Sequence, residues 1–224
     1  MLIAIGDIHA TSDNLERLMI ELKDFQNKSD DHTFIFLGDY VDRGPDAKGV
    51  VDYLLQFKEK NNCIFLKGNH EDMMLHPIDH GSWYRNGGID TINSYKNQKD
   101  FENHLEVFYK RLWLKYETPE IFFCHAGVHP SYPLANQIEN DLLWIRKGFL
   151  GWPEPFEKMI VHGHSVESLD KPVQKTNRIN LDTGAVFGGK LTAALLEPGK
   201  SIITGGETLN VEFVQVDSSF TWKK

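Results

Sequence analysis

The chain has 224 residues, of which 41% are hydrophobic and 25% are charged. This composition excludes a disordered chain and is sufficient for a sizeable core in a single domain. The formal net charge of -8 disfavours general binding to nucleic-acid backbones, so we expect no stable nucleic-acid complex. The N-terminus lacks a basic flank followed by a long apolar core. We therefore expect no signal peptide, no membrane span and a cytoplasmic location.

Three short apolar runs near the N-terminus, at residues 2–5, 33–37 and 63–66, each stop at a polar loop. Helical patterns follow at residues 15–22 and 50–57, and a polar helical region spans residues 71–115. Strand, loop and helix in this order predict βαβ units and a parallel sheet. We interpret residues 71–115 as an insertion over the sheet edge.

Further β-rich runs occupy the second half of the chain. Residues 121–124 and 158–161 predict two more strands that end in histidines. Four short runs with intervening glycines follow, and we expect them to form a second sheet: residues 178–181, 191–196, 201–204 and 211–216. The two cysteines, Cys63 and Cys124, lie in such runs and are expected to be buried free thiols.

Five predicted strands end in polar clusters, and ligands of α/β sheets bind at the carboxyl ends of strands. We therefore expect these side chains to converge. Oxygen and nitrogen donors without thiolates suit Mn, Fe, Zn, Co or Ni, and six donors suit two ions that share Asp39. Each residue alone also fits a helix cap or a core histidine. The candidates are Asp7, His9, Asp39, Asn69, His125 and His164, whereas His32, His76, His80 and His104 are expected on the surface.

Five ordered runs resemble the calcineurin-like metallophosphoesterase superfamily, and the phosphoprotein phosphatase branch in particular. They are Gly6-Asp7-Ile8-His9, Gly38-Asp39-Tyr40-Val41-Asp42-Arg43-Gly44, Gly68-Asn69-His70-Glu71, His125-Ala126-Gly127 and Gly163-His164. The runs at residues 141–146, 161–164 and 177–185 are similar to bacterial and phage serine/threonine phosphatases. Bacterial symmetrical diadenosine tetraphosphatases are also similar.

The resemblance implies one catalytic domain over residues 1–224 with a four-layer αββα sandwich of two mixed sheets flanked by helices. It also implies two divalent ions, with manganese expected first. Asp7, His9 and Asp39 would bind one ion, and the other would take the donors Asp39, Asn69, His125 and His164. His162, which precedes the matching Gly-His pair, is expected either to contact a metal ligand from outside the metal site or to be structural.

Catalytic roles also follow from the resemblance. His70 would be the general acid that protonates the leaving group, and Asp42 would orient it. Arg43 and Arg146 would clamp the phosphate, and Asn69 and Phe187 would contact the substrate. Three residues depart from the usual pattern. Ala10 stands where glycine is usual, and Lys67 stands where arginine often precedes the Gly-Asn-His run. Phe187 lacks the hydroxyl of a tyrosine found in eukaryotic relatives.

The leading hypothesis is hydrolysis of phosphoserine or phosphothreonine in proteins, by in-line attack of a hydroxide that bridges the two ions. The alternative is hydrolysis of dinucleoside polyphosphates such as diadenosine tetraphosphate. An inactive metal-bound scaffold and a nuclease are further alternatives, and the acidic charge disfavours the nuclease. The expected partners are a phosphorylated protein, a small phosphoester or a nucleotide. The sequence leaves the oligomeric state open.

Overall fold

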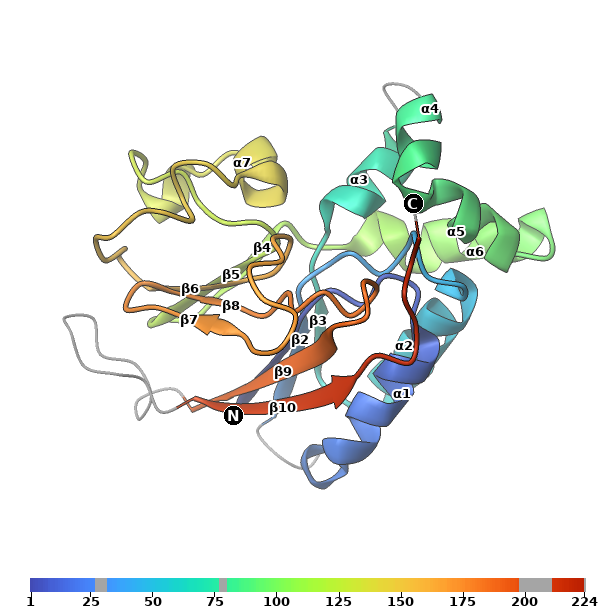
Figure 1. Cartoon of the computed structure of the whole chain (residues 1–224), viewed down its shortest axis with the longest axis horizontal. Coiled ribbons are helices and arrows are strands. Elements are labelled where there is room, and N and C mark those ends of the chain that lie inside the picture. Colours follow the sequence, from blue (N-terminus) through green and yellow to red (C-terminus); the bar gives the residue numbers. More distant parts are fainter. Residues whose placement is uncertain (27–31, 77–79, 198–210, 224) are drawn as a thin grey trace.

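The computed structural model describes residues 1–26, 32–76, 80–197 and 211–223. Two five-stranded sheets lie face to face in the middle of the molecule, with helices on their outer faces (Figure 1). This arrangement confirms the predicted α/β class and the two mixed sheets flanked by helices. In the described residues, no helix combines the length and the apolar character that crossing a bilayer would need.

The first sheet has the strand order β10-β9-β1-β2-β3. Its parallel half contains β1 (Leu2–Ile5), β2 (Thr33–Phe36) and β3 (Cys63–Phe65), as the sequence predicts. Helices α1 (Ser12–Glu21) and α2 (Ala47–Lys60) connect these strands and turn their apolar faces to the sheet. The carboxyl ends of β1, β2 and β3 therefore point to the same edge.

The prediction that the C-terminal strands form a second sheet is wrong for two of these strands. Strands β9 (Lys190–Leu196) and β10 (Glu212–Asp217) instead join the first sheet in antiparallel orientation, with β9 beside β1. All four residues of β1 are buried, so its second edge needs hydrogen-bond partners, and β9 supplies them. The predicted strand at residues 201–204 lies outside the described residues.

The second sheet has the order β4-β5-β6-β8-β7 and comes from the middle of the chain. Its parallel strands β5 (Ile121–Cys124), β6 (Met159–His162) and β8 (Arg178–Asn180) are flanked by antiparallel β4 (Lys115–Glu117) and β7 (Val173–Gln174). The polar strand ends that we expect to converge thus come from two sheets.

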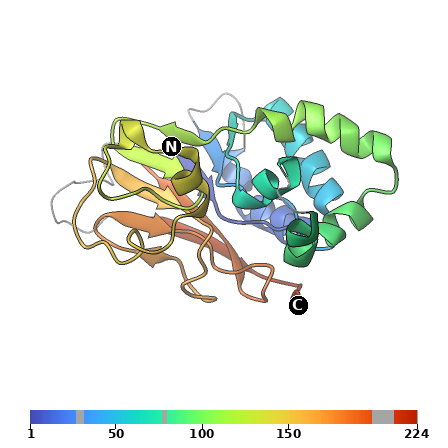
Figure 2. The ribbon, with the colours of Figure 1, turned by 90° about the horizontal axis from the view of Figure 1, so that it is seen from above.

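Three apolar clusters correspond to the spaces between the layers. One packs the first sheet against α1 and α2, and a second, with Ala4, Ile35, Phe123 and Val161, lies between the sheets. The third covers the outer face of the second sheet beneath α7 (Glu139–Trp144) and the 3₁₀ turn η4 (Leu134–Asn136). Figure 2, which shows the molecule from above, places α7 over the second sheet.

The region between β3 and β4 is helical. It contains α3 (Asn69–Leu75), α4 (His80–Trp83), the π-helical turn η2 (Tyr84–Gly88), α5 (Ile89–Ser94) and α6 (Gln98–Val107), and short 3₁₀ turns lie at η1 (Lys23–Phe25) and η3 (Tyr109–Arg111).

Two side-chain expectations need correction. His104 is buried rather than exposed, because Tyr95 and Asp52 from neighbouring helices supply partners for both ring nitrogens. Both cysteines are free, as expected, but only Cys124 is buried, whereas Cys63 is partly exposed.

Candidate metal centre and active site

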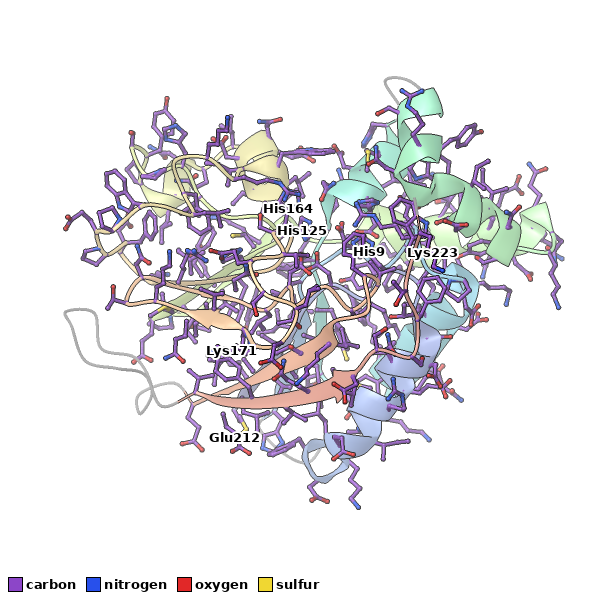
Figure 3. The ribbon with its side chains drawn as sticks, in the orientation of Figure 1. His9, His125, His164, Lys171, Glu212 and Lys223 are labelled. Carbon is purple, nitrogen blue, oxygen red and sulfur yellow. The ribbon has the colours of Figure 1, made fainter. Side chains whose placement is uncertain are left out.

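The polar ends of five strands meet where the two sheets approach each other. Asp7 and His9 follow β1, Asp39 follows β2, and Asn69 opens the helix after β3. His125 follows β5, and His164 follows β6 in the other sheet. Figure 3 shows His9 on one side of this junction and His125 and His164 on the other. All six predicted metal-site residues are buried.

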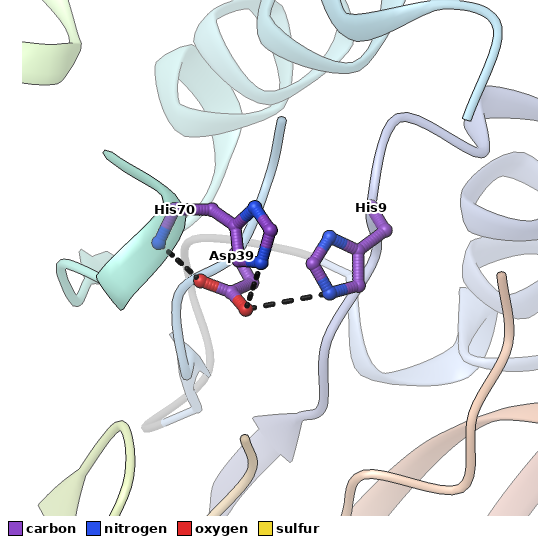
Figure 4. A group of neighbouring side chains, drawn as sticks. All are labelled: His9, Asp39 and His70. Atoms are coloured by element: carbon purple, nitrogen blue, oxygen red, sulfur yellow. Dashed lines mark hydrogen bonds and ion pairs between the residues drawn. The ribbon is translucent and has the colours of Figure 1, made fainter. Parts of the chain in front are cut away.

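Two groups of imidazole and carboxylate atoms lie close enough together to hold a cation. One contains His9, Asp39 and His70, and the other contains Asp39, His125 and His164. Both groups share Asp39. Figure 4 shows the first group, in which Asp39 Oδ2 lies 3.3 Å from His9 Nε2 and 4.0 Å from His70 Nε2.

The tautomer of His125 gives the strongest indication of a cation site. Its Nδ1 lies 2.8 Å from the carbonyl oxygen of Leu37, so Nδ1 carries the proton and donates. Burial lowers the pKa of His125 below its ordinary value, so Nε2 presents a lone pair. That lone pair faces Asn69 Oδ1 at 2.9 Å and Asp39 Oδ1 at 3.4 Å. Three acceptors that converge in this way repel one another unless a cation lies among them.

His9 has the same tautomer at the other group, but its Nε2 also lies 2.7 Å from the Arg43 Nη1 donor. Its Nδ1 donates to the carbonyl of Val41 at 2.9 Å, and Nε2 faces Asp39. Burial and the Arg43 guanidinium hold the pKa of His9 well below its ordinary value. His164 brings Nδ1 to within 2.8 Å of Asn69 Oδ1, and its buried Nε2 has no partner among the described residues. The donor set therefore fits divalent cations of the transition series.

Asp7 lies beside these groups but belongs to neither of them. Its two carboxylate oxygens accept the backbone N–H of His164 at 3.2 and 3.0 Å. Burial, together with the charges of Asp182 and Asp39, raises the pKa of Asp7 well above its ordinary value. A concentration of buried carboxylates is costly without compensating positive charge, which is a second property expected of a metal site.

The loops that carry these residues are conformationally strained. Among the described residues, six non-glycine residues have positive φ angles between 46° and 71°: His9, Ala10, Asp39, Asp42, Arg43 and His164. Five of them belong to the predicted motifs, and Ala10 directly follows the first motif. Such conformations cost free energy and persist where surrounding contacts enforce them. The positive φ of Ala10 explains why glycine would be the natural residue at this position.

Glu71 enforces part of this geometry. Its Oε2 accepts the N–H groups of Asp39 and Gly68, each at 2.9 Å, and its Oε1 accepts those of Tyr40 at 2.8 Å and Val41 at 3.2 Å. One fully buried carboxylate thus joins the loop after β2 to the loop after β3. Asp39 Oδ1 reinforces the same junction because it accepts the N–H of His70 at 3.0 Å.

The predicted dyad of His70 and Asp42 is present. His70 Nδ1 donates to Asp42 Oδ2 at 2.6 Å, and both side chains are buried. This bond leaves Nε2 directed toward Asp39 and the centre of the site (Figure 4). The indole N–H of Trp83 also donates to Asp42, and the Thr91 hydroxyl does the same.

Arg43 lies at the His9 side of the centre. Its Nη1 is 2.7 Å from His9 Nε2, and its guanidinium lies over the rings of Phe187 at 5.2 Å and Trp222 at 5.8 Å. Arginine over aromatic faces is held by cation–π attraction. The predicted substrate residues Arg43 and Phe187 are therefore in contact with each other.

Arg146 and His162 occupy different positions. Arg146 is exposed just after α7, and its charge acts on His125, His164 and Asp182. His162 joins neither cation-binding group. It is fully buried, and its Nε2 lies 3.2 Å from Nη1 of Arg178, which is itself bound to Glu167 at 2.7 Å.

A family model for the calcineurin-like phosphoesterases matches residues 1–205 of the chain. The chain belongs to this family. Members of the family use divalent metals, which agrees with the two histidine and aspartate groups that share Asp39. The chain is thus a metallophosphoesterase.

Two individual relatives are similar to the chain at low sequence identity. The bis(5'-nucleosyl)-tetraphosphatase PrpE [asymmetrical] of Oceanobacillus iheyensis is 26% identical over 84% of this chain and 86% of its own length. The protein of the same name from Anoxybacillus flavithermus is 25% identical over 84% and 87%.

Two solved structures share the fold. A candidate diadenosine tetraphosphatase has a TM-score of 0.72 at 22% identity, with 97% of this chain and 93% of that chain covered. A serine/threonine phosphatase from Saccharomyces cerevisiae has a TM-score of 0.63 at 17% identity, covering 100% of this chain and 80% of that chain.

Sequence reasoning assigned no role to several residues that surround the centre. Asp182 and Glu71 stood inside recognised runs, so their acidic side chains were visible but their contacts were not. Trp83, Thr91 and Trp222 are distant in sequence from the residues they contact. For Trp83 and Trp222, the signal in the sequence is that tryptophan is uncommon, with 5 in the chain.

Proposed function

We propose that the protein is a metallophosphoesterase that hydrolyses dinucleoside tetraphosphates. The observation that supports the metal centre most strongly is the His125 lone pair, which faces two oxygen acceptors. In this proposal Asp7, His9 and Asp39 hold one divalent ion. The donors of the other are Asp39, Asn69, His125 and His164.

Several side chains around the metal centre would each have a separate role in phosphoester hydrolysis. Bound divalent ions supply an activated water and positive charge for the phosphoryl oxygens. Arg43 is placed beside His9 to bind phosphate oxygens, and its aromatic neighbours restrict its movement. Asp42 holds Nδ1 of His70, so Nε2 faces the centre and would carry the proton for the leaving group when the ring is protonated on both nitrogens. Exposed Arg146 adds positive charge near His164 for further phosphates.

The substrate class is supported by the relatives and by one surface feature. Both curated relatives described above carry the name bis(5'-nucleosyl)-tetraphosphatase and are matched over most of their length. Trp144 is 38% exposed, and its ring centroid lies 6.3 Å from that of His164. An exposed indole beside a phosphate-binding centre suits a substrate that carries flat bases on its phosphates.

A substrate panel tests the proposal. The purified protein would be assayed with Mn²⁺, Co²⁺, Ni²⁺ and Zn²⁺ on diadenosine tetraphosphate and 4-nitrophenyl phosphate. We expect turnover of both, with a higher kcat/KM for the dinucleotide. Turnover of 4-nitrophenyl phosphate without any cleavage of diadenosine tetraphosphate would refute the substrate class. No turnover of either with any metal would refute the catalytic assignment, and the inactive scaffold would then be preferred.

Phosphoserine or phosphothreonine in proteins is the second candidate substrate, and the His70–Asp42 dyad favours it. A nucleotide is a good leaving group, whereas a serine or threonine alkoxide must be protonated as it departs. A buried dyad with a 2.6 Å hydrogen bond is well suited to that task. Release of phosphate from a phosphoserine peptide, faster than dinucleotide cleavage at equal concentration, would make this candidate the preferred one.

A further inference from the structure

We infer that Trp83 and Thr91 are positioning residues that fix the Asp42–His70 dyad. This inference rests on the metal-dependent phosphoester hydrolysis of the proposed function, and it concerns the proton that His70 gives to a leaving group that cannot depart as a stable anion. Both residues come from the helical region after α3, 41 and 49 positions along the chain from Asp42. The helical region after α3 thereby supplies two of the residues that orient the Asp42–His70 dyad.

Thr91 holds Asp42 through both backbone and side chain. Its hydroxyl accepts the N–H of Asp42 at 2.9 Å and donates its own proton to Asp42 Oδ1 at 2.6 Å. Asp42 needs such support, because its φ of 70° lies in the left-handed region. A single hydroxyl thus fixes both the strained backbone and one carboxylate oxygen.

Trp83 completes the set of donors around the carboxylate. Its indole N–H lies 3.1 Å from Oδ1 and 3.0 Å from Oδ2 of Asp42, between the bonds made by Thr91 and His70. Asp42 is fully buried, so these three donors replace water as partners of its oxygens. The direction of the carboxylate is therefore set from three sides, and it in turn sets the plane of the His70 ring.

The backbone around Trp83 is shaped for this contact. A Cβ atom at Gly88 would lie 2.5 Å from the indole ring, and one at Gly87 would lie 2.5 Å from the backbone nitrogen of Arg43. Gly87 also has a φ of 102° and accepts the N–H of Arg43 through its carbonyl at 3.3 Å. Two adjacent glycines thus allow the π-helical turn to approach both Trp83 and the Asp42–Arg43 segment.

A general acid acts only when its proton points at the departing oxygen, and small displacements of a positioned group reduce rates strongly. Loss of Trp83 or Thr91 donors would leave the phosphate and metal contacts in place but let the His70 ring turn. The resulting defect must depend on the leaving group. It should be large for an ester whose leaving oxygen needs a proton and small for one that departs as an anion.

The experiment compares phenyl phosphate, a poor leaving group, with 4-nitrophenyl phosphate, a good one of similar shape, in the Mn²⁺-loaded protein. Trp83→Phe and Thr91→Val remove donors, whereas Thr91→Ser keeps the hydroxyl. Tyr95→Phe is the matched control, because Tyr95 makes buried hydrogen bonds to His104 and Tyr109 in the same region without contacting Asp42. Thermal unfolding and metal content would be measured for every variant.

For Trp83→Phe and Thr91→Val we expect kcat on phenyl phosphate to fall about tenfold or more. On 4-nitrophenyl phosphate we expect a change within about threefold, and Thr91→Ser should behave nearly as the wild type. Equal losses on both esters, or the same leaving-group profile in Tyr95→Phe, would overturn the inference. If Trp83→Phe does not fold, the Thr91 pair decides. A wild type that hydrolyses neither ester would instead defeat the proposed function.

Discussion

At the scale of single residues, the metal centre contains several buried carboxylates, and each of them alone would lower the stability of the folded protein. Asp182 is buried beside Asp7 and Asp39, and burial, together with the Asp39 charge, raises the pKa of Asp182 to about 6 from an ordinary value of 3.8. Burying such carboxylates reduces the stability of the metal-free protein. The same carboxylates favour cation binding, so the side chains that lower the stability of the metal-free protein are the ones that function requires.

This gives a pH-dependent prediction for Asp182→Asn in chelator. The raised pKa means that the folded state keeps a proton that the unfolded state releases above pH ~4. The contribution of Asp182 therefore destabilises the protein progressively as the pH rises from about 4 to about 6, by roughly 3 kcal/mol in all. We expect Asp182→Asn to be more stable than the wild type at pH 7.5, with the difference vanishing near pH 4. Urea unfolding at both pH values measures it.

Asn can keep the one hydrogen bond that Asp182 Oδ1 accepts from the N–H of Gly184 at 3.0 Å, so the comparison isolates the charge. The exposed Asp24→Asn serves as the control and should show no such gain. A variant of Asp182 that is less stable than the wild type at pH 7.5 without metal would contradict the prediction.

At the scale of elements, the C-terminal tail reaches the active site. Ser219 bonds to Asn14 in α1, and Trp222 donates its backbone N–H to Val186 at 2.7 Å. The Trp222 indole N–H bonds to Asp90 in α5 at 3.2 Å, and its ring packs near Phe187. The tail therefore joins three separate elements and ends over the Arg43 guanidinium.

We expect Trp222→Ala to weaken substrate binding. Arg43 would lose one of its two aromatic contacts, and cation–π contacts contribute about 0.5–2 kcal/mol, which corresponds to roughly a 2- to 30-fold rise in KM. The value of kcat for 4-nitrophenyl phosphate should change less than KM, and Trp222→Phe should recover most of the loss. Trp113→Ala, at a 55% exposed tryptophan, is the control. An unchanged KM in Trp222→Ala would show that the tail does not restrain Arg43.

The elements also show what the sequence could reveal. Strands β1, β2, β3, β5 and β6 and their polar ends were predictable, because each is a short apolar run that stops at a motif. The pairing of β9 with β1 was not predictable, since it joins residues nearly two hundred positions apart and depends on which strand edge remains open. The contacts of Trp83 and Thr91 with Asp42 were hidden for the same reason.

At the scale of the whole molecule, the centre lies at the junction of the two sheets. Asp7, His9, Asp39 and Asn69 come from loops of the first sheet, and His125 and His164 come from the second. An apolar layer that includes Ala4 and Phe123 also lies between the facing sheets. Cations held by both sets of donors would connect the two halves of the fold.

Metal binding should therefore stabilise the whole domain. A ligand at 100 times its Kd contributes about 2.7 kcal/mol, and for a domain of this size that corresponds to a rise in Tm of roughly 5–10 °C. We expect the rise on adding Mn²⁺ to chelator-treated protein, measured by calorimetry. Asp39→Asn, which changes the shared ligand, should remove most of it, and the exposed Glu102→Gln should retain it. An equal rise in Asp39→Asn would contradict a shared site.

The four N–H groups bound by Glu71 also define which parts of the molecule can vary independently. Because one side chain joins the loops that carry Asp39 and Asn69, those two donors shift together or not at all. The C-terminal tail and the surface around Trp144 lie outside this joined unit. Changes at those outer surfaces can therefore alter substrate preference without moving the donors that Glu71 holds in place.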